Sequence, residues 1–381
     1  MIPVYKPYLP PEVLTHAHAA LDSTWISSKG KYIPLIEQQL SSMHSNEDVR
    51  INNALVCCNG TAATHLLSRM LKKGFPKINK LIVPNNVYVA AWNAFLYDGF
   101  FELEAVDADL DTWNWDTEKL YDLLGKSNLE ETALLAVHNI GNIVNVPQIQ
   151  KDWKGLVIVE DNCEGFLGKY GHCYSGTLSF ASSMSFFGNK TATSGEGGAI
   201  VVPDLYKGYI YKLRSQGQSD ERFVHDEFGY NYRMTNVQAA ILHGQLLNIN
   251  TIIQKKSYVF DMYKELLKDI DEIAFQKSDP DTKHANWMFG IRFKGGTGYQ
   301  NAEKFFNNNY IDVRPMFYPV HAHKHLEHIK SYGGSAVAEQ LNKECLILPS
   351  YPELKDHEIC HIANTVMRYI GQLPYSTEEY K

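Results

Sequence analysis

The stretch Leu156-Val157-Ile158-Val159-Glu160-Asp161 is a short apolar run that ends abruptly in two carboxylates. Two other runs follow the same pattern, each apolar and each followed by polar residues: Leu81–Val83 before Pro84-Asn85-Asn86, and Leu134–Val137 before His138-Asn139. Runs of this length and composition are typical of strands that are buried on both faces. We therefore expect the three runs to lie in the core of one sheet.

Amphipathic segments separate these predicted strands and favour helices, including Ala90–Leu96 and Thr117–Leu124. Strands that alternate with helices predict an α/β fold, in which a mostly parallel sheet lies between layers of helices. In such a fold, ligands bind beyond the carboxyl ends of the strands. The polar residues that follow each run, Asp161 among them, are therefore expected to face a binding site.

The chain has 381 residues, which is more than one hydrophobic core usually supports. A helical pattern from about Thr235 to Leu267 is long enough to lead from one domain into another. We expect a large domain over residues 1–250 and a smaller α+β domain over residues 251–381.

The composition argues against several kinds of function. The net charge is −7 and no basic stripe is present, so nucleic acid is not an expected partner. The first residues lack a cationic segment followed by an apolar run, and no stretch reaches the length of a membrane span. The six cysteines form no CxxC pair, which suits reduced thiols. Together these features favour a cytoplasmic enzyme without membrane or nucleic-acid partners.

The segment Ser185-Phe186-Phe187-Gly188-Asn189-Lys190, followed by Thr191–Gly198, surrounds a lysine with small residues and glycines. Glycine lets the backbone approach a bulky planar ligand. A lysine that is removed from water has a lowered pKa and can act as a nucleophilic amine. Lys190 is therefore a candidate for Schiff-base formation with a carbonyl group. A surface lysine in a turn is the alternative interpretation.

Two other segments fit the same chemistry. Asp161 is a carboxylate at the end of a predicted strand, where it could pair with a protonated pyridine nitrogen. Gly60 and Thr61 precede an apolar, helix-like segment, so their amides and hydroxyl could bind a phosphate at a helix N-terminus. An ordinary helix N-cap explains Gly60 and Thr61 equally well.

Taken in order, these motifs resemble the DegT/DnrJ/EryC1/StrS family of sugar aminotransferases, which depend on pyridoxal 5'-phosphate (PLP) and have the aspartate aminotransferase-like fold type I. The resemblance runs through most of the chain and rests on six segments: Thr24–Gly30, Asn59–Thr61, Val83–Tyr88, Val159–Asp161, Ser185–Gly198 and Gly229–Asn236. The chain departs from the family at Asn85-Asn86 and at Asn162-Cys163, and both departures bear on the shape of the sugar pocket.

The resemblance implies a cofactor site. Lys190 would be the catalytic residue, which forms the Schiff base with PLP, and Asp161 would hold the pyridine nitrogen. The residues implied to bind the phosphate are Gly60, Thr61 and Ser185.

Three further residues complete the implied cofactor site. Tyr88 would stack on the ring, and Glu164 would lie near the 3-hydroxyl group, although a solvated loop acid is the alternative for Glu164. Asn231 matches a family residue that reaches the phosphate from a second subunit. The resemblance therefore implies a homodimer with shared active sites.

The segment from Arg314 to His321 resembles the part of the family that borders the sugar-nucleotide pocket. The candidate substrate contacts are Trp25, Ser28, Arg314, Tyr318 and His321. Four histidines at alternate spacing could instead suggest a metal site: His321, His323, His325 and His328. Because the Cys or carboxylate ligands that commonly complete such a site are missing there, we expect no metal.

The implied reaction has two halves. An amino acid, which we expect to be L-glutamate, gives its amino group to the cofactor and leaves as 2-oxoglutarate, so that pyridoxamine phosphate is formed. A nucleotide-linked keto sugar then accepts the amino group. Lys190 would move the proton in both halves.

The motifs are most similar to those of the perosamine synthases, which act at C4 of GDP-4-keto-6-deoxymannose. A 4-aminotransferase for UDP- or dTDP-4-keto-6-deoxyglucose, of the viosamine type, shares nearly all of them. A further alternative is a related dehydratase, but such enzymes carry histidine at the position of Lys190, so Lys190 argues against it. The last alternative is a catalytically silent regulator that binds sugar nucleotides on the same fold.

Overall fold

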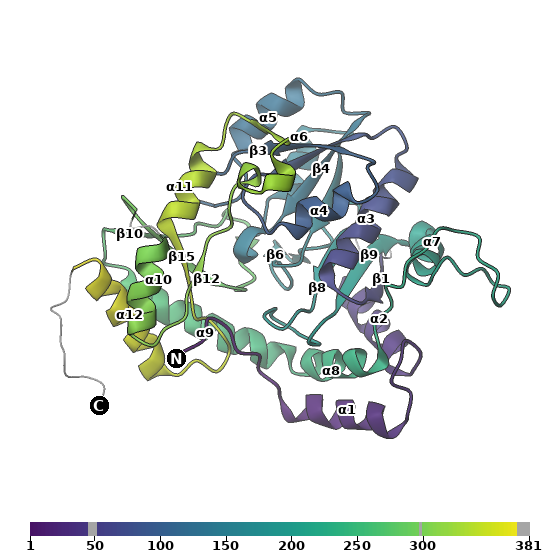
Figure 1. The fold of residues 1–381 in the computed structure, drawn as a ribbon, viewed down its shortest axis with the longest axis horizontal. Helices are drawn as coiled ribbons and strands as arrows, with labels where there is room; N and C mark the ends of the chain where they lie inside the picture. The colour runs from purple at the N-terminus through teal and green to yellow at the C-terminus, as the bar shows by residue number, and fades with distance from the viewer. Residues whose placement is uncertain (45–51, 297–298, 372–381) are drawn as a thin grey trace.

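The computed structural model of the chain describes residues 1–44, 52–296 and 299–371. Its largest sheet has eight strands and lies between helices (Figure 1). In order across the sheet, the strands are β1 (Asn52–Cys57), β9 (Gly198–Pro203), β8 (Ser182–Ser185), β5 (Val157–Asp161), β4 (Thr132–Val137), β2 (Lys80–Pro84), β3 (Glu102–Val106) and β14 (Lys330–Tyr332). Each pairing is parallel except the two made by β9. The predicted α/β fold with a mostly parallel sheet is confirmed.

The three apolar runs form β2, β4 and β5, as predicted. On one face of the sheet lie α3 (Gly60–Gly74), α4 (Ala90–Leu96) and α7 (Asp204–Arg214), and on the other lie α2 (Tyr32–Met43), α5 (Thr117–Gly125), α6 (Val146–Asp152) and α8 (Asn236–Leu247). Successive residues of β2 point to opposite faces, because Leu81 packs with α3 and α4 whereas Ile82 packs with α5 and α6. Burial on both faces explains why these strands are continuously apolar.

A second, antiparallel sheet lies beside the first and contains β10 (Ile273–Phe275), β12 (Phe289–Phe293), β15 (Cys345–Leu348) and β13 (Arg314–Pro315). Three helices pack on it around a shared apolar cluster: α9 (Ile249–Leu267), α10 (Tyr299–Asn308) and α12 (Asp356–Tyr369). Helix α11 (Ala336–Glu344) belongs to a separate cluster that also holds Trp113 from the large sheet's side. Because β14 returns to the edge of the large sheet, the C-terminal part is not confined to one sheet, and the boundary near residue 250 stays a prediction.

The remaining elements are short, apart from α1 (Pro11–Asp22), which packs along α8. They are a three-stranded ribbon of β6 (Lys169–Tyr170), β7 (Cys173–Tyr174) and β11 (Thr282–Lys283), and three 3-10 turns, η1 (Asn139–Gly141), η2 (Val320–Ala322) and η3 (Lys324–Leu326). Of the helices in the described part of the chain, none combines the length and apolar character that a bilayer crossing requires.

The helical pattern from Thr235 to Leu267 forms two helices, so the prediction of one continuous helix is wrong at Asn248. The backbone of Asn248 has φ −108° and ψ 13°. Its side-chain amide donates to Glu12 Oε2 and to Gly244 O, both at 3.0 Å. The change of direction keeps α8 on the large sheet and carries α9 to the small sheet (Figure 1).

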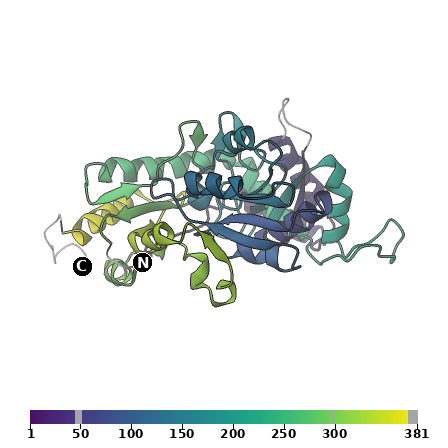
Figure 2. The same cartoon turned by 90° about the horizontal axis from the view of Figure 1, so that it is seen from above.

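Residues 215–231 form an arm that projects from the body next to α7 (Figures 1 and 2). Isolated bridges between Ser215 and Asn231 and between Gln218 and His225 hold its two sides together. Phe223 and Phe228 on the arm are 78% and 80% exposed. The arm therefore carries apolar side chains away from the core of its own chain.

Candidate active site

A cavity of about 600 Å³ lies at the carboxyl end of the large sheet. One wall is formed where the chain leaves four strands of that sheet, β1, β2, β5 and β8. It consists of the start of α3, the turn before α4, the end of β5 and the loop after β8. The opposite wall comes from residues just before β12 and around β13 of the small sheet. The ends of neighbouring parallel strands thus bring polar side chains into one space, as the sequence predicts.

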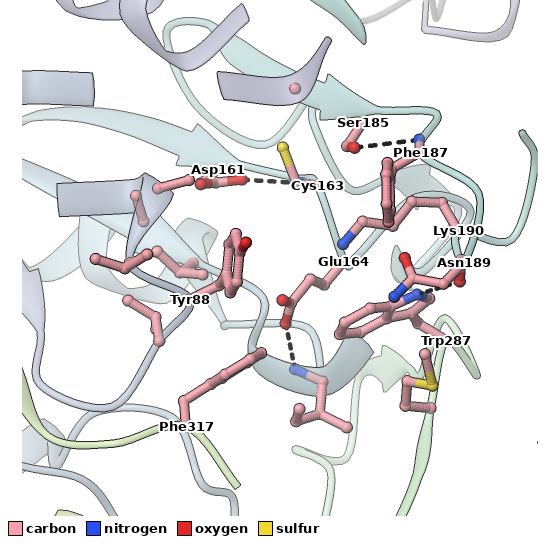
Figure 3. Close-up of a pocket in the computed structure, with 18 of the residues that line it drawn as sticks. Tyr88, Asp161, Cys163, Glu164, Ser185, Phe187, Asn189, Lys190, Trp287 and Phe317 are labelled. Carbon is pink, nitrogen blue, oxygen red and sulfur yellow. Dashed lines mark hydrogen bonds between the residues drawn. The ribbon is translucent and has the colours of Figure 1, made fainter. Parts of the chain in front are cut away.

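Lys190 lies in the loop after β8, and its amine points into the cavity between Cys163 and Glu164 (Figure 3). The amine nitrogen is 3.8 Å from the centroid of the Trp287 ring. The backbone does turn here, since Lys190 N donates to Phe187 O at 2.9 Å, but the side chain lines the cavity. An amine that lines a cavity in this way can reach a carbonyl carbon of a ligand bound there.

Asp161 ends β5 and is buried, with 6% of its surface exposed. Its register partner is Val137, the last residue of β4, so the carboxylate lies at the edge of the sheet that borders the cavity. Asp161 Oδ1 accepts a hydrogen bond from Cys163 N at 3.0 Å. A carboxylate held at this point can pair with a protonated ring nitrogen.

Glu164 is buried and lines the cavity, so the alternative of a solvated loop acid is wrong. Its Oε2 accepts a hydrogen bond from Ile140 N at 2.8 Å. Burial raises the pKa of Glu164 to about 7, although the charge of Lys190 acts in the opposite direction. Ile140 has a φ of 59°, which β-branched residues rarely adopt, and its amide is thereby aimed at Glu164. This carboxyl group can therefore exchange a proton near neutral pH.

The start of α3 and the end of β8 form one corner of the cavity. Helix α3 begins at Gly60, and the side chain of Asn59 caps it by accepting from Ala62 N at 2.8 Å, so the N-cap interpretation is confirmed and phosphate binding stays a prediction. A Cβ at Gly60 would lie 2.6 Å from Ser185 Cβ, so only glycine allows this approach. Thr61 and Ser185 line the cavity at this corner, and a helix N-terminus with hydroxyl side chains close to it is suited to bind a phosphate.

Tyr88 lies on the far side of the cavity from Lys190, with its ring 5.9 Å from that of Phe317 (Figure 3). It is 57% exposed, so one face of the ring is free to cover a planar ligand. The lysine amine, the strand-end carboxylate, the anion-binding corner and this ring surround a single space of suitable size. These residues fit PLP, because each chemical group of the cofactor has a matching group on the wall.

The two departures from the family pattern occupy different places. Cys163 lines the cavity, and burial raises the pKa of its thiol well above the usual value. Asn85 lies behind the cavity wall and is fully buried. Its Oδ1 accepts from Val320 N at 3.0 Å and its Nδ2 donates to Ser335 Oγ at 2.8 Å. Asn85 therefore shapes the pocket indirectly, by holding the segment that follows Tyr318.

Of the predicted substrate contacts, some line the cavity and others lie outside it. Arg314 and Tyr318 line the cavity. The side chain of Arg314 is 58% exposed and pairs with Asp312 at 3.1 Å, so it remains accessible to an anionic ligand. His321 does not line the cavity, and its Nε2 lies 3.3 Å from Glu339 Oε1. Within the described ranges, no three His, Cys, Asp or Glu side chains gather as metal ligands.

Three other predicted residues lie outside the cavity of the single chain. Trp25 is 59% exposed and Ser28 is partly exposed, in a segment that docks on α8 through a hydrogen bond of 2.7 Å from Asn236 Nδ2 to Trp25 O. Asn231 is exposed at the base of the projecting arm. The substrate contacts of Trp25 and Ser28, and the reach of Asn231 to the cofactor of a second subunit, stay predictions.

Several cavity residues carry no signal in the sequence. Trp287, Met288 and Phe317 reach the cavity from the small-sheet side, and Val4 reaches it from the N-terminal segment. Phe317 lies within the segment from Arg314 to His321 but was not singled out there, and Val4, Trp287 and Met288 belong to no quoted motif, because they are ordinary apolar residues whose place depends on how distant segments pack. Trp287 is the most important of them, since it contacts the amine of Lys190 and donates from Nε1 to Asn189 O at 2.9 Å.

Comparisons with known proteins agree with this geometry. Residues 8–367 match the DegT/DnrJ/EryC1/StrS aminotransferase family. The chain is 34% identical to a GDP-perosamine synthase of Escherichia coli O157:H7, over 97% of this chain and 98% of that protein. It is 31% identical to a GDP-perosamine synthase of Vibrio cholerae, over 97% of this chain and 100% of that protein.

Solved structures share the fold at lower identity. A sugar aminotransferase of Micromonospora echinospora superposes with a TM-score of 0.83 at 22% identity, covering 97% of this chain and 100% of that chain. A family member of Brucella abortus also has a TM-score of 0.83, at 20% identity, covering 94% of this chain and 95% of that chain. The match along nearly the whole chain, with the cavity geometry, shows that the protein belongs to the DegT/DnrJ/EryC1/StrS aminotransferase family and is a PLP-dependent aminotransferase.

Proposed function

We propose that the protein transfers the amino group of L-glutamate to C4 of a nucleotide-linked 4-keto-6-deoxyhexose and forms a 4-amino-4,6-dideoxy sugar nucleotide. The preferred sugar substrate in this proposal is GDP-4-keto-6-deoxymannose, with GDP-perosamine as the product. The observation that carries the proposal is the cavity in which Lys190, Asp161 and Glu164 face one another beside an anion-binding corner. The choice of sugar is supported by the names of the two perosamine synthases.

PLP, when bound, supplies an aldehyde that accepts an amino group and a ring that withdraws electrons. Asp161 holds a proton at the ring nitrogen, and the start of α3 with Ser185 binds the phosphate. Tyr88 covers one face of the ring and excludes water from it. Lys190 would hold the cofactor at rest, and its amine, once released, would take up and return a proton in each half of the reaction.

Glu164 has a second part in this proposal. With a pKa of about 7, its carboxyl group can hold or release a proton close to the amine of Lys190. Arg314 and Tyr318 lie at the side of the cavity that borders the small sheet, where the nucleotide part of the substrate would bind. The exposed guanidinium of Arg314 suits a diphosphate.

A coupled assay of glutamate-dependent amination tests the reaction. The sugar substrates to compare are GDP-4-keto-6-deoxymannose, UDP-4-keto-6-deoxyglucose and dTDP-4-keto-6-deoxyglucose, with the Lys190→Ala protein as the control. Preferred turnover of the GDP sugar supports the proposal. Preferred turnover of the UDP or dTDP sugar supports the viosamine-type alternative, which a dTDP-4-amino-4,6-dideoxy-D-glucose transaminase of Escherichia coli represents at 25% identity.

An absorbance spectrum separates the enzyme from a silent regulator. A lysine-bound cofactor colours the protein, and reduction with borohydride should fix the cofactor to Lys190 in a peptide map. Binding of sugar nucleotides without colour or turnover would favour the regulator.

We further propose that the protein acts in the cytoplasm as a homodimer in which Asn231 reaches the phosphate of the partner's cofactor. Mixing two inactive variants, Lys190→Ala and Asn231→Ala, tests the shared site. In a mixed dimer, one site has an intact Lys190 from one chain and an intact Asn231 from the other. Recovery of activity on mixing supports shared sites, and no recovery in a verified mixed dimer argues against them.

A further inference from the structure

Lys256 on α9 is a buried lysine with no part in the proposed reaction, and only 1% of its surface is exposed. Its Nζ donates to two backbone carbonyls, Trp287 O at 3.0 Å and Ser350 O at 2.9 Å. Burial lowers the pKa of Lys256 to about 7. An uncharged amine still has two N–H groups, so it satisfies both carbonyls without carrying a charge.

A buried lysine is costly compared with an apolar side chain of the same length. The two hydrogen bonds offset this cost. They join α9 to the segment before β12 and to the segment after β15, and so fix the position of both segments on the helix. Two titratable groups close to Lys256, Tyr5 and His284, are uncharged at neutral pH, because burial raises the pKa of Tyr5 and, together with the charge of the exposed Lys264, lowers the pKa of His284 to about 3.

Two aromatic side chains connect Lys256 to Lys190. Lys256 holds the carbonyl of Trp287, whose ring lies against the amine of Lys190 at 3.8 Å. The Nζ of Lys256 also lies 5.0 Å from the ring of Tyr5, whose hydroxyl donates to Lys190 O at 2.8 Å. Both the amine and the backbone of Lys190 are thus supported by residues that Lys256 contacts.

We propose that Lys256 is a positioning residue: it fixes Trp287 and Tyr5, which hold Lys190 in the orientation that catalysis requires. The inference rests on the proposed role of Lys190 as the lysine that binds PLP. In this role, Lys256 on α9, which packs on the small sheet, would help to position Lys190, which follows β8 of the large sheet.

Three variants test this role. Lys256→Met keeps an unbranched side chain that ends at Cε and removes both donors. Lys256→Gln places two N–H donors one bond short of Nζ and carries no charge, so it should restore part of what the methionine variant loses. Lys264→Met, at an exposed lysine two turns further along α9, is the matched control.

The readout is the pH midpoint at which the absorbance band of the PLP-bound protein changes, measured without amino donor or sugar. An aromatic ring face stabilises a cationic nitrogen, so release of Trp287 in Lys256→Met should lower the midpoint by about half a pH unit, a change of about threefold in proton affinity. Lys264→Met should keep the wild-type midpoint, and the midpoint of Lys256→Gln should lie between those of the wild type and Lys256→Met. A protein that is merely less stable would lose bound cofactor without moving the midpoint.

A wild-type midpoint in a folded, PLP-bound Lys256→Met protein would overturn the inference, as would a shifted midpoint in Lys256→Gln equal to that of Lys256→Met. If Lys256→Met does not fold, Tyr5→Phe decides, because it removes only the bond to Lys190 O. The half-reaction with glutamate should then slow by about fivefold, as expected for one hydrogen bond, and an unchanged rate refutes the role. Failure of every sugar to react would count against the proposed function alone, whereas absence of a wild-type absorbance band would count against both.

Discussion

Replacement of Gly60 by alanine tests whether the start of α3 and Ser185 form the phosphate site. The new Cβ would lie 2.6 Å from Ser185 Cβ and 2.9 Å from its Oγ. Ordinary carbon contacts need about 3.5–4 Å, so the helix start and Ser185 must separate by about 1 Å. A phosphate could then no longer bond to both at once. Loss of one hydrogen bond to a charged group costs about 1.5–3 kcal/mol, so PLP should bind about tenfold to a hundredfold more weakly.

The assay is a titration of the apoprotein with PLP, followed by absorbance, together with urea unfolding of the apoprotein. Gly208→Ala on α7 is the control, because a Cβ there meets nothing within 4 Å. It should leave the affinity for PLP unchanged and stabilise the protein by about 0.5–1 kcal/mol, since alanine favours a helix more than glycine does. If Gly60→Ala binds PLP as tightly as the wild type and folds normally, the assignment of this corner to the phosphate is refuted.

Three further perturbations follow from buried groups. The pKa of Glu164 is raised to about 7, so its ionisation lowers the stability of the fold above pH 7, and this loss disappears as the pH falls towards 4.5. In urea titrations of the apoprotein, the free energy of unfolding of Glu164→Gln should exceed that of the wild type by about 2–3 kcal/mol at pH 8 and should equal it at pH 4. Lys256 has a lowered pKa of about 7, so wild-type stability should rise between pH 7 and pH 10, whereas Lys256→Met should lack most of that rise when unfolding is measured at both limits. Gly244→Ala would bring a Cβ to 2.5 Å from Val13 Cα and should lower the free energy of unfolding by about 1–3 kcal/mol.

The fold was predictable where local pattern and burial agree. The apolar runs became β2, β4 and β5 because a strand that is buried on both faces needs no polar residues except at its ends. The reversed direction of β9 and the return of β14 to the large sheet were not predictable, since strand pairing depends on contacts between distant segments. The break at Asn248 was not predicted either, because the side chain of Asn248, which ends α8, forms a hydrogen bond with Glu12 on helix α1, which is distant in sequence.

The site was predictable to the extent that its residues lie in motifs next to strand ends. Lys190, Asp161, Glu164, Ser185, Gly60, Thr61 and Tyr88 all line one cavity. Trp287 was missed, although it contacts the amine of Lys190, because a tryptophan before a strand resembles any core residue. His321 was predicted to contact substrate, yet in this chain it pairs with Glu339 outside the cavity.

The sequence by itself determined the class of fold, the strand ends that carry polar side chains and, through the resemblance of its motifs to the family, the cofactor; it also predicted Lys190 as the lysine that binds it. The fold class and the strand ends follow from local composition, which sets burial and backbone freedom within a few residues. Only the tertiary structure decided that Glu164 is buried, that Ile140 presents its amide to it, and that Lys256 contacts Trp287 and Tyr5, which both contact Lys190. The physical reason is that the hydrogen bonds among these contacts join residues 24 to 185 positions apart, which meet only when the chain packs into its tertiary structure, and no local pattern records them.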